Sequence, residues 1–153
     1  MSQTILGTTD DKITINGELT YGDIPGTRPE NHGLLMNARF IQGIFDDRAD
    51  VGRFSRFGRS WDADENTDGL IRALPEWKRY GLLAFTVGLQ GGMPVLTISN
   101  KTIDNNPYSE DGTRIDPEYL DRLDRLITAA DQLGMVVIVS LLYQGQSPRM
   151  RDG

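Results

Sequence analysis

Cysteine is absent from this 153-residue chain, and histidine occurs once. The first absence excludes disulfides, thiol nucleophiles and zinc-thiolate sites. A Ser-His-Asp triad would have to use His32, which precedes the first predicted buried strand, so we do not expect that chemistry. No residues have the spacing of three metal ligands, and the glycines after residue 87 lack the spacing and the lysine of a phosphate loop. We therefore expect no metal and no cofactor.

Positive charge and long apolar runs are also scarce. The 16 Lys and Arg residues face 22 Asp and Glu residues, for a net charge of −6, which argues against attraction to nucleic acid or to an anionic membrane. The longest apolar run is too short to cross a bilayer, and the first residues lack the basic and apolar regions of a signal peptide. We expect one soluble, acidic domain without nucleic-acid or membrane partners; the composition does not identify its compartment.

The first part of the chain favours strands. Asn16 and Gly17 lie between two short runs of strand-forming residues, which predicts a β-hairpin over residues 12–22. After a loop rich in Pro and Gly, residues 34–45 have the composition of a strand that ends at an acidic pair.

A helix and a buried strand follow. Asn66 and Thr67 are suited to cap a helix with apolar residues at helical spacing, and Pro75 is expected to kink or split it. Gly81 is expected to end the helix, and residues 82–89 then predict an almost continuously apolar strand.

A second helix and strand have the same order. Asp116 as N-cap and Pro117 as the first helical residue predict the start of the helix, and Gly134 its end. Its apolar stripe consists of Leu120, Leu123, Leu126, Ile127, Ala130 and Leu133. Residues 135–143 are apolar except for Ser140, which is typical of a strand that flanking helices bury on both faces.

The two helix–strand units share one plan, in which a helix end is followed by Gly, an apolar strand and Gln-Gly. This repeat predicts an α/β fold of right-handed β-α-β units with parallel strands. Ligands of such sheets bind where the loops leave the carboxyl ends of the strands. An ordinary doubly wound domain is the alternative, and it would place the strands in a non-sequential order.

Several segments resemble one family of enzymes. Residues 15–21 followed by 33–40, residues 74–77 with 81–86, and residues 116–120 with 134–138 are similar to the amino-terminal part of cellulase-like (β/α)8 glycoside hydrolases of clan A, which include family five. The resemblance covers nearly the whole chain from about residue 12 and implies a TIM barrel of roughly 250 residues or more.

In that barrel, residues 1–153 would form a single incomplete domain, with the hairpin at 12–22 and three barrel strands with two crossover helices within 33–153. The family's catalytic Glu residues follow the fourth and seventh strands, so the resemblance implies no catalytic residue in this chain. We expect the chain alone to be inactive, to take a carbohydrate as its partner and to self-associate through open sheet edges.

The residues after the predicted strands are candidates for sugar binding. Asp46 and Asp47 follow the first strand, and because neighbouring residues on a strand point opposite ways, at most one of them would face a site. Loop capping or solvation is the alternative. Residues 52–61 interleave Arg with aromatic residues, so Trp61 is a candidate wall of a sugar subsite, although a loop held by Arg–Asp pairs is the plainer interpretation.

Gln90 follows the second strand, and Tyr143 and Gln144 follow the third. Amides and phenols hydrogen-bond sugar hydroxyls, and an aromatic face stacks on a pyranose ring, whereas Gln-Gly can also simply begin a turn. A second functional hypothesis therefore stays open beside the glycosidase fragment: a self-contained small α/β domain that binds a carbohydrate or a protein without chemistry.

Overall fold

The protein contains two small sheets and two α-helices, as seen in a computed structural model that describes residues 3–48, 52, 54–90 and 106–143. The antiparallel sheet has the order β1 (Leu6–Thr9), β2 (Lys12–Ile15), β3 (Glu18–Leu19). The parallel sheet has the order β4 (Asn37–Arg39), β5 (Ala84–Gly88), β6 (Val136–Ser140). The fold is therefore α/β, as predicted, and its parallel strands are in sequential order.

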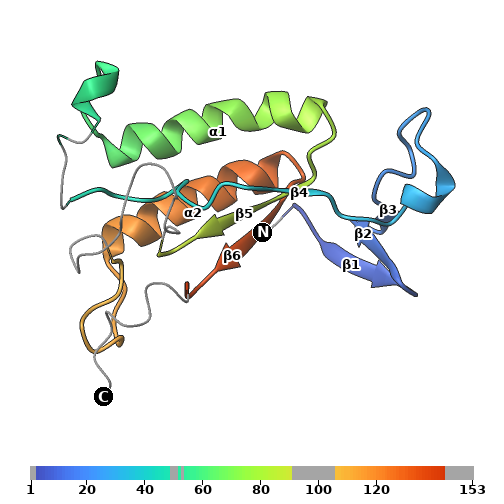
Figure 1. The fold of residues 1–153 in the computed structure, drawn as a ribbon. Helices are drawn as coiled ribbons and strands as arrows, with labels where there is room; N and C mark the ends of the chain where they lie inside the picture. The colour runs from blue at the N-terminus through green and yellow to red at the C-terminus, as the bar shows by residue number, and fades with distance from the viewer. Residues whose placement is uncertain (1–2, 49–51, 53, 91–105, 144–153) are drawn as a thin grey trace.

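Two long helices connect the parallel strands. Helices α1 (Ala63–Arg79) and α2 (Pro117–Gln132) cover the same face of the parallel sheet, and the antiparallel sheet lies near the amino ends of its strands (Figure 1). Two short 3-10 helices, η1 (Pro29–Asn31) and η2 (Ser55–Phe57), lie in the loops. Within the described residues, no helix combines the length and apolar character needed to cross a membrane.

The predicted hairpin is confirmed and is part of a larger sheet. Asn16 and Gly17 both have positive φ angles, 56° and 85°, as a two-residue turn between antiparallel strands requires. Strand β1 pairs with the other edge of β2, with Leu6 opposite Ile15. This strand was not predicted, because the sequence Leu-Gly-Thr-Thr is mostly exposed and has no alternating apolar pattern.

The strand predicted over residues 34–45 is much shorter than expected. The strand itself spans only Asn37–Arg39, after which the chain turns and buries Ile44 and Phe45 outside any strand. Two side chains of α1 stabilise the turn: Asn66 Nδ2 donates to the Gln42 carbonyl at 2.9 Å, and Thr67 Oγ1 donates to the Gly43 carbonyl at 2.9 Å.

Asn66 and Thr67 are therefore not the cap of α1. The helix begins at Ala63, and the Asp62 side chain caps it by accepting a hydrogen bond from the Glu65 N–H at 2.9 Å. Pro75 was expected to kink or split the helix; the helix is continuous through Pro75, so it is not split. Its end was predicted correctly, because Gly81 follows the C-cap residue with a φ of 89°.

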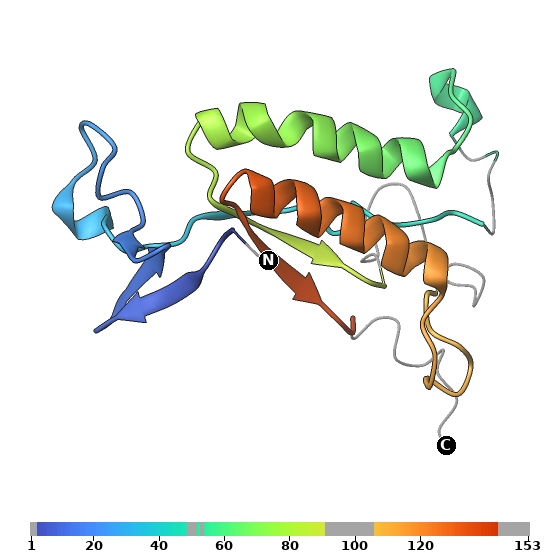
Figure 2. The ribbon, with the colours of Figure 1, turned by 180° about the vertical axis from the view of Figure 1, so that it is seen from behind.

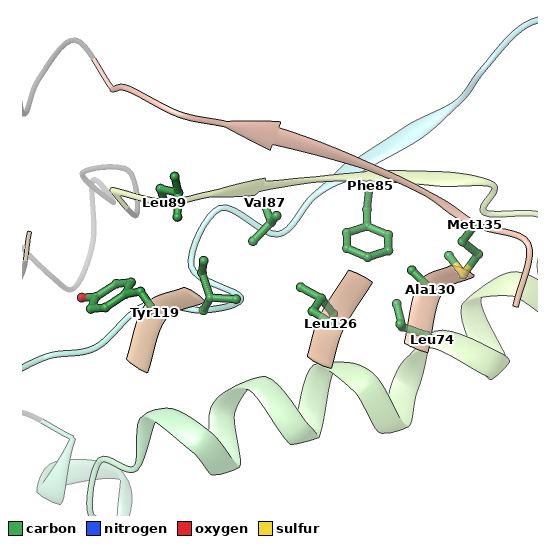
Figure 3. Close-up of a cluster of buried hydrophobic side chains, with 9 residues drawn as sticks. Leu74, Phe85, Val87, Leu89, Tyr119, Leu126, Ala130 and Met135 are labelled. Carbon is green, nitrogen blue, oxygen red and sulfur yellow. The ribbon is translucent and has the colours of Figure 1, made fainter. Parts of the chain in front are cut away.

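The core lies between the parallel sheet and both helices (Figure 3). Phe85 and Val87 of β5 point toward Leu126 and Ala130 of α2 and Leu74 of α1, and all five side chains are fully buried. Burial of apolar side chains of this size stabilises a fold by roughly 1.5–3 kcal/mol each. Strand β5 is therefore held both by its two neighbouring strands and by the two helices.

Strand β6 is not buried on both faces, contrary to the prediction. Val137 and Val139 pack against the core, but Ile138 faces the other way with 40% of its surface exposed, and Leu141 and Leu142 are more exposed still. The reason is that both helices lie on one side of the sheet, and β6 lies at its margin (Figure 2).

Gly33 joins the antiparallel sheet to the rest of the chain, and its replacement by Ala should destabilise the protein. Its N–H donates to the Thr20 carbonyl and its carbonyl accepts from Ile13 N–H, both at 2.8 Å. Gly33 has a φ of 82°, and an added Cβ would lie 2.6 Å from Lys12 Cβ; Gly26 has a φ of 83° but nothing within 4 Å.

In both variants an alanine must adopt a positive φ angle, which is strained. Only in Gly33→Ala does the added Cβ also collide with a neighbouring side chain. We expect Gly33→Ala to lower the free energy of unfolding by about 1–3 kcal/mol more than Gly26→Ala does. Chemical denaturation of the two variants measures the difference, and equal losses would contradict the predicted collision.

Candidate functional site

An arginine at the carboxyl end of the parallel sheet binds three carboxylates. Arg48 Nε donates to Asp46 at 2.9 Å, Nη2 donates to Glu118 at 2.7 Å, and Nη1 donates to Asp116. We call these four residues the arginine clamp. It joins the chain that follows β4 to the amino terminus of α2.

Two members of the clamp, Arg48 and Asp116, have pKa values shifted toward their charged forms. The hydrogen bond with Asp116 is the largest of the effects that raise the pKa of Arg48. Burial acts to raise the pKa of Asp116, but hydrogen bonds from Arg48 and from the Glu118 N–H outweigh it, so the pKa lies below its ordinary value. Asp116 thus serves both as the predicted helix cap and as a ligand of the arginine.

Asp46 and Trp61, both candidates from the sequence, lie in contact. Trp61 Nε1 donates to Asp46 Oδ1 at 3.0 Å, and the indole is stacked on Phe54 with ring centroids 4.8 Å apart. The Phe45 ring packs against the indole at 5.8 Å. Asp47 is fully buried. Both Asp46 carboxylate oxygens are thus engaged within the protein, one by the indole and one by the clamp.

Tyr119 and Arg122 of α2 complete the buried side of this region. The Tyr119 hydroxyl lies 3.2 Å from the Asp46 backbone nitrogen, from which it accepts a hydrogen bond, and burial raises the pKa of Tyr119 to about 12. The Arg122 guanidinium lies over the Tyr119 ring at 4.7 Å, and its Nε donates to the Ile44 carbonyl at 3.1 Å. Neither residue was predicted, although Arg122 interrupts an apolar helix face and was a visible signal.

Gln90 and Tyr143 are also brought together. Tyr143 N–H donates to Gln90 Oε1 at 2.6 Å, and Gln90 Nε2 donates to Asn106 Oδ1 at 3.3 Å. Tyr108 adds two hydrogen bonds to this chain: its N–H donates to Asn106 Oδ1, and its hydroxyl donates to the Leu141 carbonyl. The Gln90 and Asn106 side chains are both buried. We call this set the amide chain.

Tyr143 borders an open groove of about 730 Å³ along β4 and α1. Its other walls include Arg39, Phe40, Leu70, Ala73 and Trp77, and we call it the β4 groove. Gln144, the remaining candidate, lies outside the described residues. The site thus has two separate parts, the arginine clamp with Trp61 and the amide chain with Tyr143.

The geometry is suited to binding rather than to proton transfer. Among the described residues, no group of three His, Asp or Glu side chains is placed to hold a metal ion. The Asp46 carboxylate accepts hydrogen bonds from a guanidinium and from an indole N–H, so both of its oxygens already have partners within the protein. The neutral amides and phenols nearby are groups that hydrogen-bond hydroxyls.

Comparisons with known proteins found no match to a family model, to a curated protein or to a solved structure.

Removal of the Arg48 guanidinium should destabilise the protein. Arg48→Gln leaves three carboxylates without their shared cation, so we expect a loss of about 1–3 kcal/mol in the free energy of unfolding. Arg28→Gln is the matched control, because Arg28 and Glu30 form an exposed pair at 3.8 Å whose loss should cost less than about 0.5 kcal/mol.

The difference in the free energy of unfolding between wild type and Arg48→Gln should be smaller in acid. A lowered pKa in the folded state contributes stability above the ordinary carboxyl value, and this contribution disappears as the pH falls through the lowered pKa. Denaturation curves at neutral pH and below about pH 4 measure the effect. A difference that does not depend on pH would show that Asp116 does not stabilise the fold through its charge.

Tyr119 should titrate later than an exposed tyrosine. Its pKa is raised to about 12 in the folded state, so the folded protein keeps this proton when the unfolded chain loses it, and stability falls as the pH rises from 10 toward 12. Near-ultraviolet absorbance of tyrosinate during an alkaline titration measures this late step. The step should be missing from Tyr119→Phe; if it remains, another tyrosine is responsible.

Proposed function

We propose that the chain forms the first strands of a (β/α)8 barrel of the cellulase-like glycosidase type and contributes part of a carbohydrate-binding face. Three features support a barrel over a doubly wound domain. The parallel strands are in the sequential order β4-β5-β6, both crossover helices cover one face, and the antiparallel sheet lies at the opposite end from the candidate site (Figure 1). The segments that resemble this enzyme family lie in these same elements.

One observation carries the proposal. Asp46, Gln90 and Tyr143 follow three adjacent parallel strands, so polar and aromatic groups gather at the carboxyl ends of the sheet, where ligands of α/β proteins bind. Tyr143 is half-buried and lines the β4 groove, and its backbone N–H donates to Gln90. An aromatic ring held in this way offers an apolar face to a sugar and a hydroxyl to its substituents.

The proposal includes no catalytic residue from this chain. Glycosidases use a pair of carboxyl groups at a fixed separation, one of them with a raised pKa. Here Asp46 is engaged by Arg48 and Trp61, and Asp47 is fully buried. In a complete barrel of this family, both catalytic Glu residues would come from later strands, so the chain alone should bind sugars without hydrolysing them.

A non-catalytic α/β domain that binds a carbohydrate or a protein is the second candidate. The side chains of the arginine clamp and of the amide chain are hydrogen-bonded to one another. This bonding favours a domain without catalytic groups, because the side chains at this end of the sheet already have partners. Both candidates predict binding at the carboxyl end of the sheet. They differ in whether added barrel strands restore hydrolysis.

Carbohydrate binding can be tested by affinity electrophoresis in gels that contain soluble β-glucan, xylan or galactomannan. We expect retardation in at least one gel and about tenfold weaker binding by Tyr143→Ala, because that variant removes the aromatic face. Tyr80→Ala is the matched control, since Tyr80 is 74% exposed, follows the last residue of α1 and is not one of the residues that line the β4 groove.

No retardation by any of the polysaccharides, or equal retention of the two variants, would reject the proposed site. Hydrolysis of aryl glycosides by the chain alone, surviving repurification, would instead contradict the proposal that the catalytic groups are supplied from elsewhere.

A further inference from the structure

The β4 groove contains an arginine that the protein itself does not bind. Arg48 and Arg125 each hold carboxylates of neighbouring segments. The guanidinium of Arg39, the last residue of β4, is exposed and forms no ion pair or hydrogen bond among the described residues. Of the described residues that line the groove, Arg39 is also the only charged one. Its guanidinium is therefore available to an anion from solution.

Arg39 lies on the face of the parallel sheet that the two helices leave uncovered (Figure 2). Ala38 packs against the core, so its neighbours Asn37 and Arg39 point to the other face. Thr86 of β5, whose two neighbours face the helices, donates to Asn37 Oδ1 at 3.2 Å on that same face. A (β/α)8 barrel encloses this face and binds ligands at the carboxyl ends of its strands, so a complete barrel would keep Arg39 at its ligand end.

A second donor in the β4 groove also lacks a partner. Gln42 follows Arg39 by three residues, and its side-chain Nε2 is buried without a hydrogen bond among the described residues. The amide nitrogen of Asn66, another residue of the groove, already donates to the Gln42 carbonyl. Buried donors of native proteins are nearly always paired with protein, water or ligand. The groove thus presents a free cation and a free amide donor, a combination suited to a ligand rich in acceptors.

From these two donors we infer that the β4 groove binds an acidic saccharide, with the carboxylate of a uronic acid residue on the Arg39 guanidinium. The inference rests on the proposed carbohydrate function and names the class of sugar. Arginine binds a carboxylate through two parallel N–H···O bonds, which a neutral sugar cannot accept in the same way. Tyr143 and Trp77, which line the same groove, would contact the sugar rings.

The charge of the whole chain makes this inference specific. With a net charge of −6, the protein repels polyanions in general. Tighter binding of an acidic saccharide than of its neutral form therefore requires a local cation. A nucleic acid suits the groove less well, because it carries a charge on every nucleotide and is held by several cations along its backbone.

Carboxyl reduction supplies a matched ligand, because it converts each uronic acid residue into a neutral hexose and leaves the linkages unchanged. Isothermal titration calorimetry compares oligosaccharides of polygalacturonate, alginate and glucuronoxylan with their reduced counterparts. We expect the chain to bind at least one acidic oligosaccharide about tenfold more tightly than its reduced form. This preference should decrease at high salt, which screens the charges.

Arg39→Gln should remove the preference and change the affinity for the reduced form by less than about twofold, because only the carboxylate loses its partner. Arg28→Gln is the matched control, since it removes the same charge from an exposed arginine in the loop between β3 and β4. Tyr143→Ala should weaken both forms alike, because its ring contacts do not involve the carboxylate. Thermal melts test whether the three variants fold.

Equal affinity for the acidic and reduced forms, with both weakened by Tyr143→Ala, would overturn the inference and leave the carbohydrate function standing. Loss of the preference in Arg28→Gln as well would also overturn it, because the effect would then belong to overall charge. So would equally tight, Arg39-dependent binding of an oligothymidylate of the same charge, since the groove would then take nucleic acid. No binding of any saccharide, acidic or neutral, would reject both proposals.

Discussion

The central strand β5 is the constraint on which the other elements depend. It is hydrogen-bonded to β4 on one side and to β6 on the other, and Phe85 and Val87 bury their side chains under both helices. A parallel strand cannot be reached by a tight turn, so each neighbour of β5 must be connected through a crossover. The two helices are these crossovers, and their burial on β5 fixes where the carboxyl ends of all three strands meet.

Charged side chains join separate elements at the carboxyl end of the sheet. Arg48 follows β4, whereas Asp116 and Glu118 begin α2, so the arginine clamp ties the first strand to the second crossover. Tyr119 adds a bond from the same helix turn to the Asp46 backbone. The apolar core and the candidate site therefore share α2: its inner face supports β5, and its amino terminus organises the side chains beyond the strands.

Local sequence signals predicted correctly those features that depend only on neighbouring residues, such as helix starts and tight turns. Asp116 and Pro117 predicted the start of α2, and the Asn16-Gly17 turn predicted its hairpin. The errors concern interactions between distant segments. Asn66 has the chemistry of a helix cap, but its amide instead bonds the turn after β4, so the helix begins earlier. Composition likewise identified β6 as a strand, but not that both helices lie on one of its faces.

For the candidate site, the sequence likewise predicted where residues lie but not which residues they contact. The positions of Asp46, Gln90 and Tyr143 follow from the strands that precede them, and the sequence predicted that they lie at one end of the sheet. The hydrogen-bond partners of these residues could not be predicted, because Arg48 meets α2 across 70 residues of chain and Asn106 lies 16 residues beyond Gln90.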